Sequence, residues 1–354
     1  MLDGLKVVHA PLEIAGQVGM ICQFLKKYNI EAVGYNYFPN YLKYTNVIDT
    51  DSYELAKIVE DLIKHYDLFH FHNGYTFFED FRDIEVILEH GKPIIMHHRG
   101  NDVRSRKRSR AWNGYENPYV NAESSLPDEE IDRNLRYFAS RVTAAIVQDH
   151  ELLSYVEDYY AAEGKKVYIL PRLFDVHRRQ PVYVKKEAAD RKILIVHAPT
   201  QRDFKGTEYI NQAMEKLQAE LPVRYQLVEH MPHADAWNMY EQADIIIDQV
   251  LCGAYGNLSI EGMALGKPVV CYIRPDLMDK YPPDLPIVSA NPDTIYDEVK
   301  ALVLDPERRH QLGRKGRAYV ENYHSAESVI KQLLTIYQEV LEPGKGAARD
   351  ERKR

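Results

Sequence analysis

The chain has 354 residues, of which 45% are hydrophobic and 28% are charged, and its formal net charge is −8. This length exceeds one ordinary core, so two domains of about 150–200 residues each are expected. The acidic balance argues against a general nucleic-acid binder, and no nucleic-acid partner is expected. The three scattered cysteines form neither a disulfide framework nor a metal spacing, which favours a reducing cytoplasm. No signal peptide is recognisable, and no apolar stretch approaches the roughly 18 residues of a membrane span.

The first half of the chain alternates short β-branched runs with segments of helical period, which is typical of parallel α/β folds. Strands are expected at 5–10, 31–37, 67–73, 92–98, 144–149 and 166–170. Helices are expected near 17–28, 51–66, 81–91 and 150–164. Asp51 or Ser52 is predicted to cap the second of these helices, which explains the acids Asp49 and Asp51 better than a metal site does.

The polar stretch 175–192 has no clear period and is predicted to be an interdomain linker. A second α/β series follows the linker, and the tail 344–354 is low in apolar residues and predicted to be disordered. Strands of this series are expected at 191–199, 223–230, 244–249 and 267–273. Its helices are expected at 207–219, 234–242 and 259–265, with further helices from about 293 onward.

The tetrapeptide Val-His-Ala-Pro occurs twice, at 8–11 and at 196–199, at the end of the first strand of each series. Ligands of parallel sheets bind beyond the carboxyl ends of the strands, so the loops after these strands are expected to face a shared cleft. The predicted fold is therefore α/β, with two facing Rossmann-like domains. Their bounds are 1–174 and 193–325, and a C-terminal helix at 326–343 is expected to pack back on the first domain.

The second Val-His-Ala-Pro loop continues into a basic segment beside a glycine, just before a helix. It places Arg202 and Lys205 where a helix amino end offers unpaired N–H groups and partial positive charge. A guanidinium and an ammonium at such a place suit a diphosphate, since Arg binds phosphate oxygens in two places at once. The alternative is a solvated polar turn.

A second cluster of interest lies at 254–270. A turn at 255–257 leads into a short helix at 258–265, which Gly266 ends. Glu261 is predicted to lie in the first turn of this helix and to face the cleft, where a carboxylate accepts hydrogen bonds from two ribose hydroxyls. The alternative is an ordinary helix-start acid that complements the helix dipole.

Taken together, these segments resemble the retaining GT-B glycosyltransferases, in particular glycosyltransferase family 4. In the second half, the resemblance rests on RDFKGT at 202–207, YEQADIIID at 240–248 and YGNLSIEGMALGKPVV at 255–270. In the first half it rests on DLFHFHNGY at 67–75, KPIIMHHRGNDVR at 92–104, VQDHELLSYV at 147–156 and YILPRLFDV at 168–176. The matching order and spacing cover about residues 5 to 340.

The resemblance implies a hexosyltransferase-like enzyme of class EC 2.4 that needs no cofactor and no metal. The domain at 193–325 would bind a nucleotide-diphosphate sugar, and the domain at 1–174 would bind a carbohydrate or glycolipid acceptor. Arg202 and Lys205 would hold the diphosphate, and Glu261 would bind the ribose. The remaining donor-binding positions implied by the family are Gly16, Gln17, Tyr255, Gly256, Asn257, Leu258 and Ser259.

Two positions depart from the family pattern. Gly253 stands where the first of two paired glutamates is usual, and Asp248 is a candidate to compensate for it. Arg99 stands where a histidine near the reacting carbon is usual, with His98 as its neighbour, and both are kept as catalytic candidates. Alternating strand geometry would point these two side chains in different directions. Two alternative functions therefore stay open: a GT-B-fold nucleotide-sugar epimerase, and a catalytically silent nucleotide-sugar-binding subunit.

Two further groups have alternative interpretations. His70 and His72 share one strand face, and acceptor contact or a structural role explains them better than a metal does. A basic cluster is either a solvated loop or a contact for an anionic acceptor or membrane surface. The chain is expected to be cytoplasmic, with peripheral contact at the inner face of the membrane as an option. The members of the cluster are Arg104, Arg106, Lys107, Arg108 and Arg110.

Overall fold

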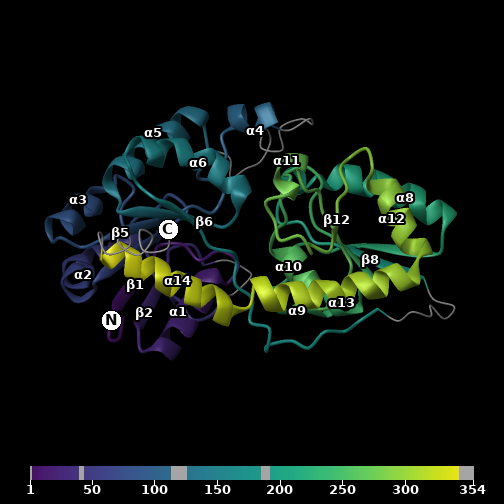
Figure 1. Ribbon diagram of the computed structural model, residues 1–354, viewed down its shortest axis with the longest axis horizontal. Helices are drawn as coiled ribbons and strands as arrows, with labels where there is room; N and C mark the ends of the chain where they lie inside the picture. The colour runs from purple at the N-terminus through teal and green to yellow at the C-terminus, as the bar shows by residue number, and fades with distance from the viewer. Residues whose placement is uncertain (1, 40–43, 113–125, 185–191, 343–354) are drawn as a thin grey trace, which may run out of the picture.

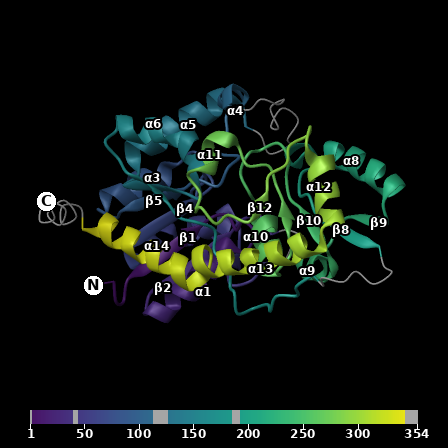
Figure 2. The same ribbon diagram turned by 45° about the vertical axis from the view of Figure 1, so that its right-hand side comes forward.

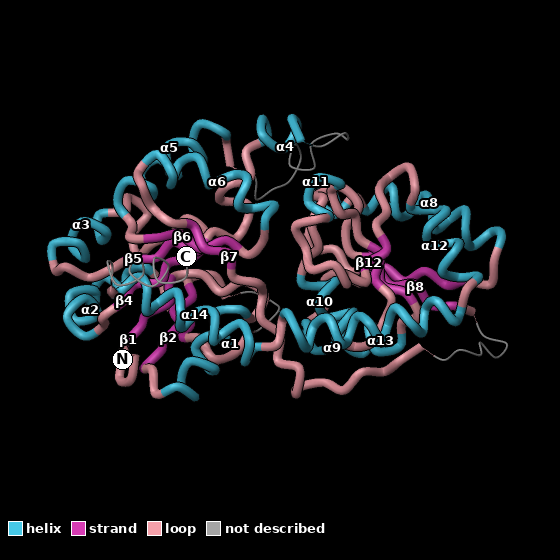
Figure 3. The backbone as a smooth tube through the Cα atoms, viewed as in Figure 1, coloured by secondary structure: helices cyan, strands magenta, loops and turns pink. Residues whose placement is uncertain are grey.

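The computed structural model describes residues 2–39, 44–112, 126–184 and 192–342. The chain forms two α/β lobes that lie side by side (Figure 1). Each lobe is built on a parallel sheet, seven-stranded in the first lobe and five-stranded in the second. Helices lie around the strands of both sheets (Figure 3). This architecture confirms the predicted fold class of two Rossmann-like domains.

The first sheet has the strand order β3-β2-β1-β4-β5-β6-β7. Its central strands are buried along their whole length except at Lys6, the first residue of β1, as expected for a parallel sheet covered on both faces. The strands are β1 (Lys6–Ala10), β2 (Glu31–Asn36), β3 (Ile48–Asp49), β4 (Leu68–His72), β5 (Ile94–His97), β6 (Ala144–Val147) and β7 (Val167–Ile169). The helices are α1 (Gln17–Leu25), α2 (Ser52–His65), α3 (Arg82–Glu89), α4 (Arg106–Trp112), α5 (Asp128–Arg141) and α6 (His150–Ala162), with a 3-10 turn at Lys26–Tyr28.

The second sheet has the order β12-β11-β10-β8-β9. Its strands are β8 (Ile193–His197), β9 (Val223–Leu227), β10 (Ile245–Ile247), β11 (Val269–Val270) and β12 (Ile287–Val288). Its helices are α7 (Arg202–Lys205), α8 (Thr207–Glu220), α9 (His233–Gln242), α10 (Asn257–Ala264), α11 (Pro275–Met278), α12 (Ile295–Leu304) and α13 (Pro306–Tyr323). Within the predicted linker, residues 185–191 lie outside the described residues, as does the predicted disordered tail.

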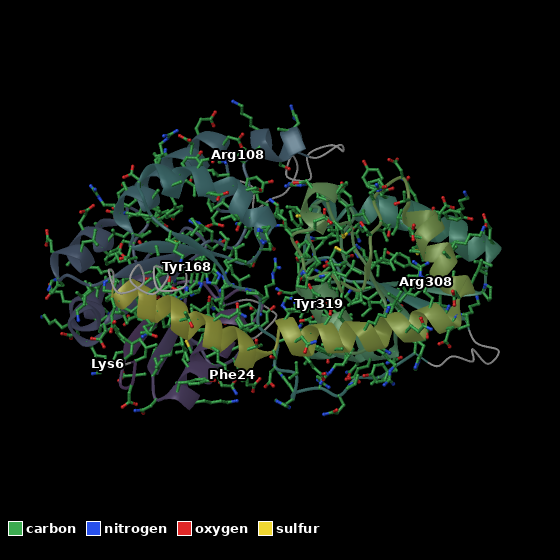
Figure 4. The ribbon with its side chains drawn as sticks, viewed as in Figure 1. Lys6, Phe24, Arg108, Tyr168, Arg308 and Tyr319 are labelled. Carbon is green, nitrogen blue, oxygen red and sulfur yellow. The ribbon has the colours of Figure 1, made fainter. Side chains whose placement is uncertain are left out.

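Helix α14 (Ala326–Leu341) follows α13 and returns to the first lobe (Figures 1 and 2). Its apolar face, including Leu333 and Tyr337, is fully buried in one core with Val7 of β1 and Ile21 of α1. On its outer side, the hydroxyl of Tyr168 donates a hydrogen bond of 2.9 Å to Glu339 (Figure 4). The C-terminal helix therefore completes the core of the N-terminal domain.

The chain passes between the lobes twice, and the two passages are hydrogen-bonded to each other. The backbone N–H of Phe174 donates to the carbonyl of His324 at 2.7 Å, and the N–H of Ala326 donates to the carbonyl of Phe174 at 2.9 Å. A parallel bridge joins Phe174 to Ser325. The hinge between the domains is thus a short two-stranded contact.

The start of α2 is capped in the way that the sequence predicts. Asp51 caps α2 by accepting the N–H of Glu54 at 2.8 Å, and Asp49 accepts a hydrogen bond of 2.8 Å from Asn36. This confirms the predicted capping role of Asp51.

Among the described helices, none has both the length and the apolar composition that crossing a bilayer requires.

Because α14 completes the first core, Leu333→Ala should lower the free energy of unfolding of the N-terminal domain by about 2–5 kcal/mol. The matched control on the same helix is Gln338→Ala, which removes an exposed side chain and should change stability by less than about 0.5 kcal/mol. Urea unfolding of both variants measures the difference. Equal stability of the two variants would show that α14 is not part of the core.

Candidate functional site

A cavity of about 660 Å³ lies between the two domains. Many of the residues that line it directly follow the carboxyl end of a strand, as the rule for parallel sheets predicts. In the first domain, 12–15 follow β1, Asn73 follows β4, and Arg99 lies two residues beyond β5. In the second domain, 198–201 follow β8 and 228–231 follow β9. The predicted facing loops therefore do meet across a cavity.

Lys205 lies on the second-domain wall of this cavity and is held in place from behind. Its Nζ donates to Asp248 Oδ1 at 2.6 Å and to Gln249 Oε1 at 2.7 Å. Asp248 is fully buried and also accepts hydrogen bonds from the N–H of Gly256 and the hydroxyl of Ser259. Burial alone would raise the pKa of Asp248, but Lys205 and these donors hold it below its ordinary value. Two of the three Nζ protons are thus committed, and the ammonium is fixed at the cavity wall.

The amino end of α10 forms the neighbouring part of the same wall. Tyr255, Gly256, Asn257 and Leu258 line the cavity, whereas Ser259 turns its hydroxyl back to Asp248. The first N–H groups of a helix have no intrahelical acceptor, and the N-cap residue Gly256 has no side chain to cap those of α10. This end of the helix therefore offers N–H donors and partial positive charge beside Lys205.

Glu261 also lines the cavity, but it lies in the second turn of α10, because the helix begins at Asn257. The prediction that it lies in the first turn was therefore wrong, since the turn residue Asn257 is itself helical. Its carboxylate accepts a hydrogen bond of 2.7 Å from His233, whose ring centroid lies 5.9 Å from that of Tyr44 in the first domain. Glu261 is thus presented at the place where both domains contribute side chains.

Arg202 is directed differently from Lys205. Its guanidinium donates to both oxygens of Glu229, at 2.8 and 2.5 Å, and it is not among the residues that line the cavity. The ion pair holds the pKa of Glu229 below its ordinary value. Of the two cations predicted for the diphosphate, the structure brings Lys205 to the cavity and leaves Arg202 engaged with Glu229.

The first Val-His-Ala-Pro loop lines the cavity with residues 12–15, but Gly16 and Gln17 lie behind it. The Gln17 amide donates to the carbonyl of Leu173 at 3.0 Å and accepts its N–H at 2.8 Å, so it fastens α1 to the hinge. Glu13 accepts the N–H groups of Val18 and Gly19 at the start of α1. Burial nevertheless raises the pKa of Glu13.

His98 and Arg99 point in different directions, as strand alternation predicts. His98 bonds Asp102 at 2.7 Å and Tyr160 at 2.8 Å, and it lines a second, smaller cavity of about 310 Å³ instead of the main one. Asp102 also accepts the N–H groups of Arg99 and Gly100. Only Arg99 reaches the main cavity, and the His98–Asp102 pair fixes the loop that carries it.

Behind Arg99 lies a buried hydrogen-bonded chain, which we call the histidine chain. It runs from Arg99 to His72 (3.2 Å), His9 (3.0 Å), Tyr337 (3.2 Å), His70 (2.8 Å) and His97 (3.2 Å). The histidines come from β1, β4 and β5, where they share one sheet face, and Tyr337 comes from α14. The chain therefore connects the cavity to the C-terminal helix.

The direction of the histidine chain follows from one residue. Arg99 can only donate, so Nδ1 of His72 must accept, and its Nε2–H donates to the next member. Repeating this step makes each of the four imidazoles a neutral Nε2–H tautomer. Burial lowers the pKa of all four, to about 3 for His9, which keeps them neutral at physiological pH.

His9, His70 and His72 bring ring nitrogens within 4.8 Å of one another, which raises the question of a metal ion. The rings of His70 and His72 are stacked, with centroids 4.6 Å apart and planes only 11° from parallel. An imidazole binds a metal in its own plane, so two nearly parallel rings do not direct their lone pairs to one point. The adjacent Arg99 guanidinium would also repel a cation. These residues fit a hydrogen-bonded chain better than a metal centre.

Arg172 is a cavity residue that the sequence interpretation did not single out. It follows β7, and its Nη1 donates to Asp149 at 3.4 Å and to the carbonyl of Tyr255 in the other domain at 3.1 Å. Its own carbonyl accepts a hydrogen bond of 2.8 Å from His324 at the hinge. Its position after a strand was the signal available in the sequence, but many residues without a functional role have the same kind of position.

The departure from the family pattern at Gly253 has a structural reason. Gly253 has a φ of 86°, and a Cβ there would lie 2.8 Å from Cβ of Arg274, so a glutamate does not fit without a shift. Asp248 is buried behind Lys205 and does not line the cavity, which leaves it unable to contact a donor directly.

The predicted basic cluster is divided in the structure. Arg104 is buried against Glu151 at 2.7 Å, and Arg108 donates to the carbonyls of Ser154 and Tyr155 (Figure 4). Arg104 is therefore not part of an exposed patch, because its charge is paired inside the domain. Lys107 and Arg110 of α4 remain exposed.

Comparison with known proteins shows similarity in sequence over part of the chain and in fold over nearly all of it. Residues 183–335 match the family described as glycosyl transferase-like. A search among curated protein sequences finds no match. Sucrose-phosphate synthase of Thermosynechococcus elongatus superposes with a TM-score of 0.65 at 14% identity, over 96% of this chain and 99% of that one.

Two further solved structures superpose over nearly the whole chain. Anabaena HepE in complex with UDP-glucose gives a TM-score of 0.61 at 10% identity, over 95% of this chain and 100% of that one. A Listeria monocytogenes protein put forward as a UDP-N-acetylglucosamine 2-epimerase gives 0.52 at 14% identity, over 97% of each chain. The chain has the GT-B fold, and its residues 183–335 are similar to glycosyl transferases.

In this GT-B protein, the glycosyltransferase-like region contains Lys205, α10 and Glu261. It also includes the whole of α13 and the first part of α14, up to residue 335. The first-domain wall that carries Arg99 lies outside that region, and so does the whole histidine chain. Its histidines belong to the N-terminal domain, and Tyr337 belongs to the last part of α14.

The direction of the hydrogen bonds in the histidine chain of this GT-B protein leads to a spectroscopic prediction. In ¹⁵N-histidine-labelled protein, His9, His70, His72 and His97 should each show an unprotonated Nδ1 and a protonated Nε2 at neutral pH. Assignment uses single histidine-to-glutamine variants. A protonated Nδ1 at any of the four would contradict the direction derived from Arg99.

Burial, followed by the charge of Arg99, lowers the pKa of His9 to about 3, so stability should depend on pH. Below pH 6.5 the unfolded chain binds a proton that the folded chain does not, and stability falls as the pH decreases. From pH 7.5 to pH 5, His9 alone should account for a loss of about 2 kcal/mol. Urea unfolding at both pH values measures this loss, and His9→Gln should show a correspondingly weaker dependence.

Proposed function

We propose that this protein transfers a sugar from a nucleotide-diphosphate sugar to an acceptor hydroxyl, with retention of configuration and without a metal ion. The observation that carries the proposal is the pairing of Lys205 with the uncapped amino end of α10 on one cavity wall. A fixed ammonium and a row of N–H donors form a site for a diphosphate.

The main difficulty of glycosyl transfer is the charge that develops on the departing diphosphate as the sugar gains oxocarbenium character. Lys205 and the α10 N–H groups would stabilise that charge, and they need no rearrangement because Asp248 already holds Lys205 in place. Glu261 would accept hydrogen bonds from the ribose hydroxyls of the donor, oriented by His233.

The carboxylates that line the cavity among the described residues are Glu13, Glu229 and Glu261. Each accepts hydrogen bonds from protein donors: the start of α1, Arg202 and His233, respectively. In the proposed mechanism the leaving diphosphate itself takes the acceptor proton, so no dedicated carboxylate base is needed. This route keeps the donor and acceptor on one face of the sugar and gives retention.

The likeness to a protein crystallised with UDP-glucose supports a uridine nucleotide as the first donor to test. The acceptor in this proposal is a carbohydrate or glycolipid hydroxyl of surface polysaccharide assembly, bound on the N-terminal side of the cavity. The setting is the cytoplasm, and the exposed Lys107 and Arg110 of α4 would allow peripheral contact with an anionic membrane.

Donor hydrolysis tests the proposal against its alternatives. Purified protein is incubated with UDP-, GDP-, ADP- and dTDP-sugars, and release of the nucleotide diphosphate is followed. Slow release with one donor supports a transferase, and conversion of the sugar without release identifies an epimerase. Binding with neither outcome, even with acceptors present, identifies a silent binding subunit and contradicts the proposal.

The role of Lys205 needs a variant that does not leave Asp248 buried and unpaired. Lys205→Ala would do so and should lower the free energy of unfolding by about 3–5 kcal/mol as well as abolish turnover. The double variant Lys205→Met with Asp248→Asn removes both charges, and should retain the fold while turnover falls by about 100- to 1,000-fold. Lys331→Met, an exposed lysine of α14, is the control. Normal turnover of the double variant would exclude Lys205 as the diphosphate ligand.

A further inference from the structure

Arg99 is a buried cation on the cavity wall, and its side chain has an incomplete set of partners. Among the residues that the structure describes, its one side-chain hydrogen bond goes from Nη2 to the neutral ring of His72, at 3.2 Å. Its Nε is buried and has no acceptor in the same part of the chain. Within the described residues, no carboxylate forms an ion pair with it. This arrangement differs from that of the cavity's other long cationic side chains.

The other lysine and arginine side chains of the cavity each have a carboxylate partner. Lys205 pairs with Asp248 at 2.6 Å, Arg104 with Glu151 at 2.7 Å, and Arg172 with Asp149 at 3.4 Å. Buried charges in proteins are paired, because an unpaired one loses its hydration without compensation. Arg99 is the exception among these four, and it faces the space that a ligand would occupy.

The nearest carboxylates act on Arg99 only through their charge, because their hydrogen bonds go to other groups. Glu13 directs its oxygens to the amino end of α1, and Asp102 directs its oxygens to His98 and to backbone N–H groups. Burial lowers the pKa of Arg99 to about 10, and the charge of Arg172 adds to this effect, but the guanidinium remains protonated at neutral pH. The protein alone therefore does not neutralise the group.

We propose that Arg99 recognises an anionic group, a carboxylate or a phosphate, on the acceptor side of the substrate. A guanidinium binds such groups through two parallel N–H donors, which gives both charge and geometry. The inference rests on the proposed function, since it names the chemistry of the acceptor of that reaction. It explains why an unpaired cation is kept inside the protein.

The acceptor side follows from the placement of the residue. The groups assigned to the donor diphosphate, Lys205 and α10, belong to the second domain, whereas Arg99 follows β5 of the first. Asn73, after the adjacent strand β4, lines the same wall with a buried side-chain carbonyl oxygen that has no partner among the described residues. A hydroxyl of the acceptor would donate to Asn73, and its anionic group would accept from Arg99.

The histidine chain serves this recognition by orienting the guanidinium. Because His72 accepts from Nη2, the side chain is held from behind, while Nη1 has no hydrogen-bond partner among the described residues. A carboxylate in place of His72 would hold Arg99 equally well but would cancel its charge. A neutral acceptor keeps the charge available to a ligand.

The test follows the Nε–H signal of Arg99 in ¹⁵N-arginine-labelled full-length protein, assigned by its loss in Arg99→Gln. Glucose, glucuronate and glucose 6-phosphate are titrated as probes, with and without UDP. The anionic sugars should shift this signal, while glucose at the same concentration should not. Arg99→Gln should bind the anionic sugars about 10- to 100-fold more weakly and bind UDP as the wild type does. Arg136→Gln, an exposed arginine of α5, is the control and should change neither affinity.

Two results would overturn the inference. If Arg99→Gln weakens UDP binding and leaves the anionic sugars unaffected, the guanidinium serves the donor diphosphate. If the variant changes no affinity, Arg99 binds no anion. These titrations require no turnover, so they remain interpretable if the protein proves not to be a transferase.

Thermal unfolding adds a readout that separates recognition from a structural role. Removing an uncompensated buried charge should leave the midpoint of Arg99→Gln equal to or above that of the wild type. A marked fall in the midpoint would show that Arg99 stabilises the fold and would contradict the inference. Arg99→Lys, which keeps the charge, should retain part of the affinity for the anionic sugars.

Discussion

The packing of α14 on the N-terminal sheet is the constraint on which the rest of the molecule depends. This helix belongs to the end of the chain, yet its buried face completes the core that contains β1 and α1. The chain must therefore cross between the domains twice, and the bridge between Phe174 and Ser325 fixes where it does so. The same helix supplies Tyr337 to the histidine chain. The packing of α14 thus determines both how the two domains are connected and how the side chains behind the cavity wall are arranged.

The charges of the cavity are organised in two layers. Lys205 and Arg104 stand at the cavity surface, and their partners Asp248 and Glu151 are buried behind them. Such pairs are set during folding, so a ligand meets donors that need little reorganisation. Arg99 breaks this pattern because a neutral histidine stands where the others have a carboxylate. Lys205, Arg104 and Arg172 thus carry their counter-charges from folding, whereas under the proposal above a ligand supplies the counter-charge of Arg99.

The sequence predicted what depends on local pattern. Buried parallel strands appear as continuous apolar runs, so most strands, both sheets and the divergence of His98 and Arg99 followed from the chain alone. The two-residue strands β3 and β12 are too short to show a period and were not predicted. Contacts between distant residues were also missed: Glu229 engages Arg202, and Leu173 engages Gln17, in pairings that depend on tertiary structure. The meeting of the four histidines depends on strand register in the same way.

The one-way character of the histidine chain limits how these positions could diverge in evolution. Each imidazole must present an acceptor toward Arg99 and a donor toward the far end, at a spacing set by the sheet. Among uncharged side chains, the amides of Asn and Gln and the hydroxyls of Ser, Thr and Tyr also combine both functions, while Leu would interrupt the sequence of bonds. A change at one position would therefore favour compensating changes at the others. A histidine in place of Arg99 would also permit the opposite direction, because a histidine, unlike an arginine, can accept a hydrogen bond.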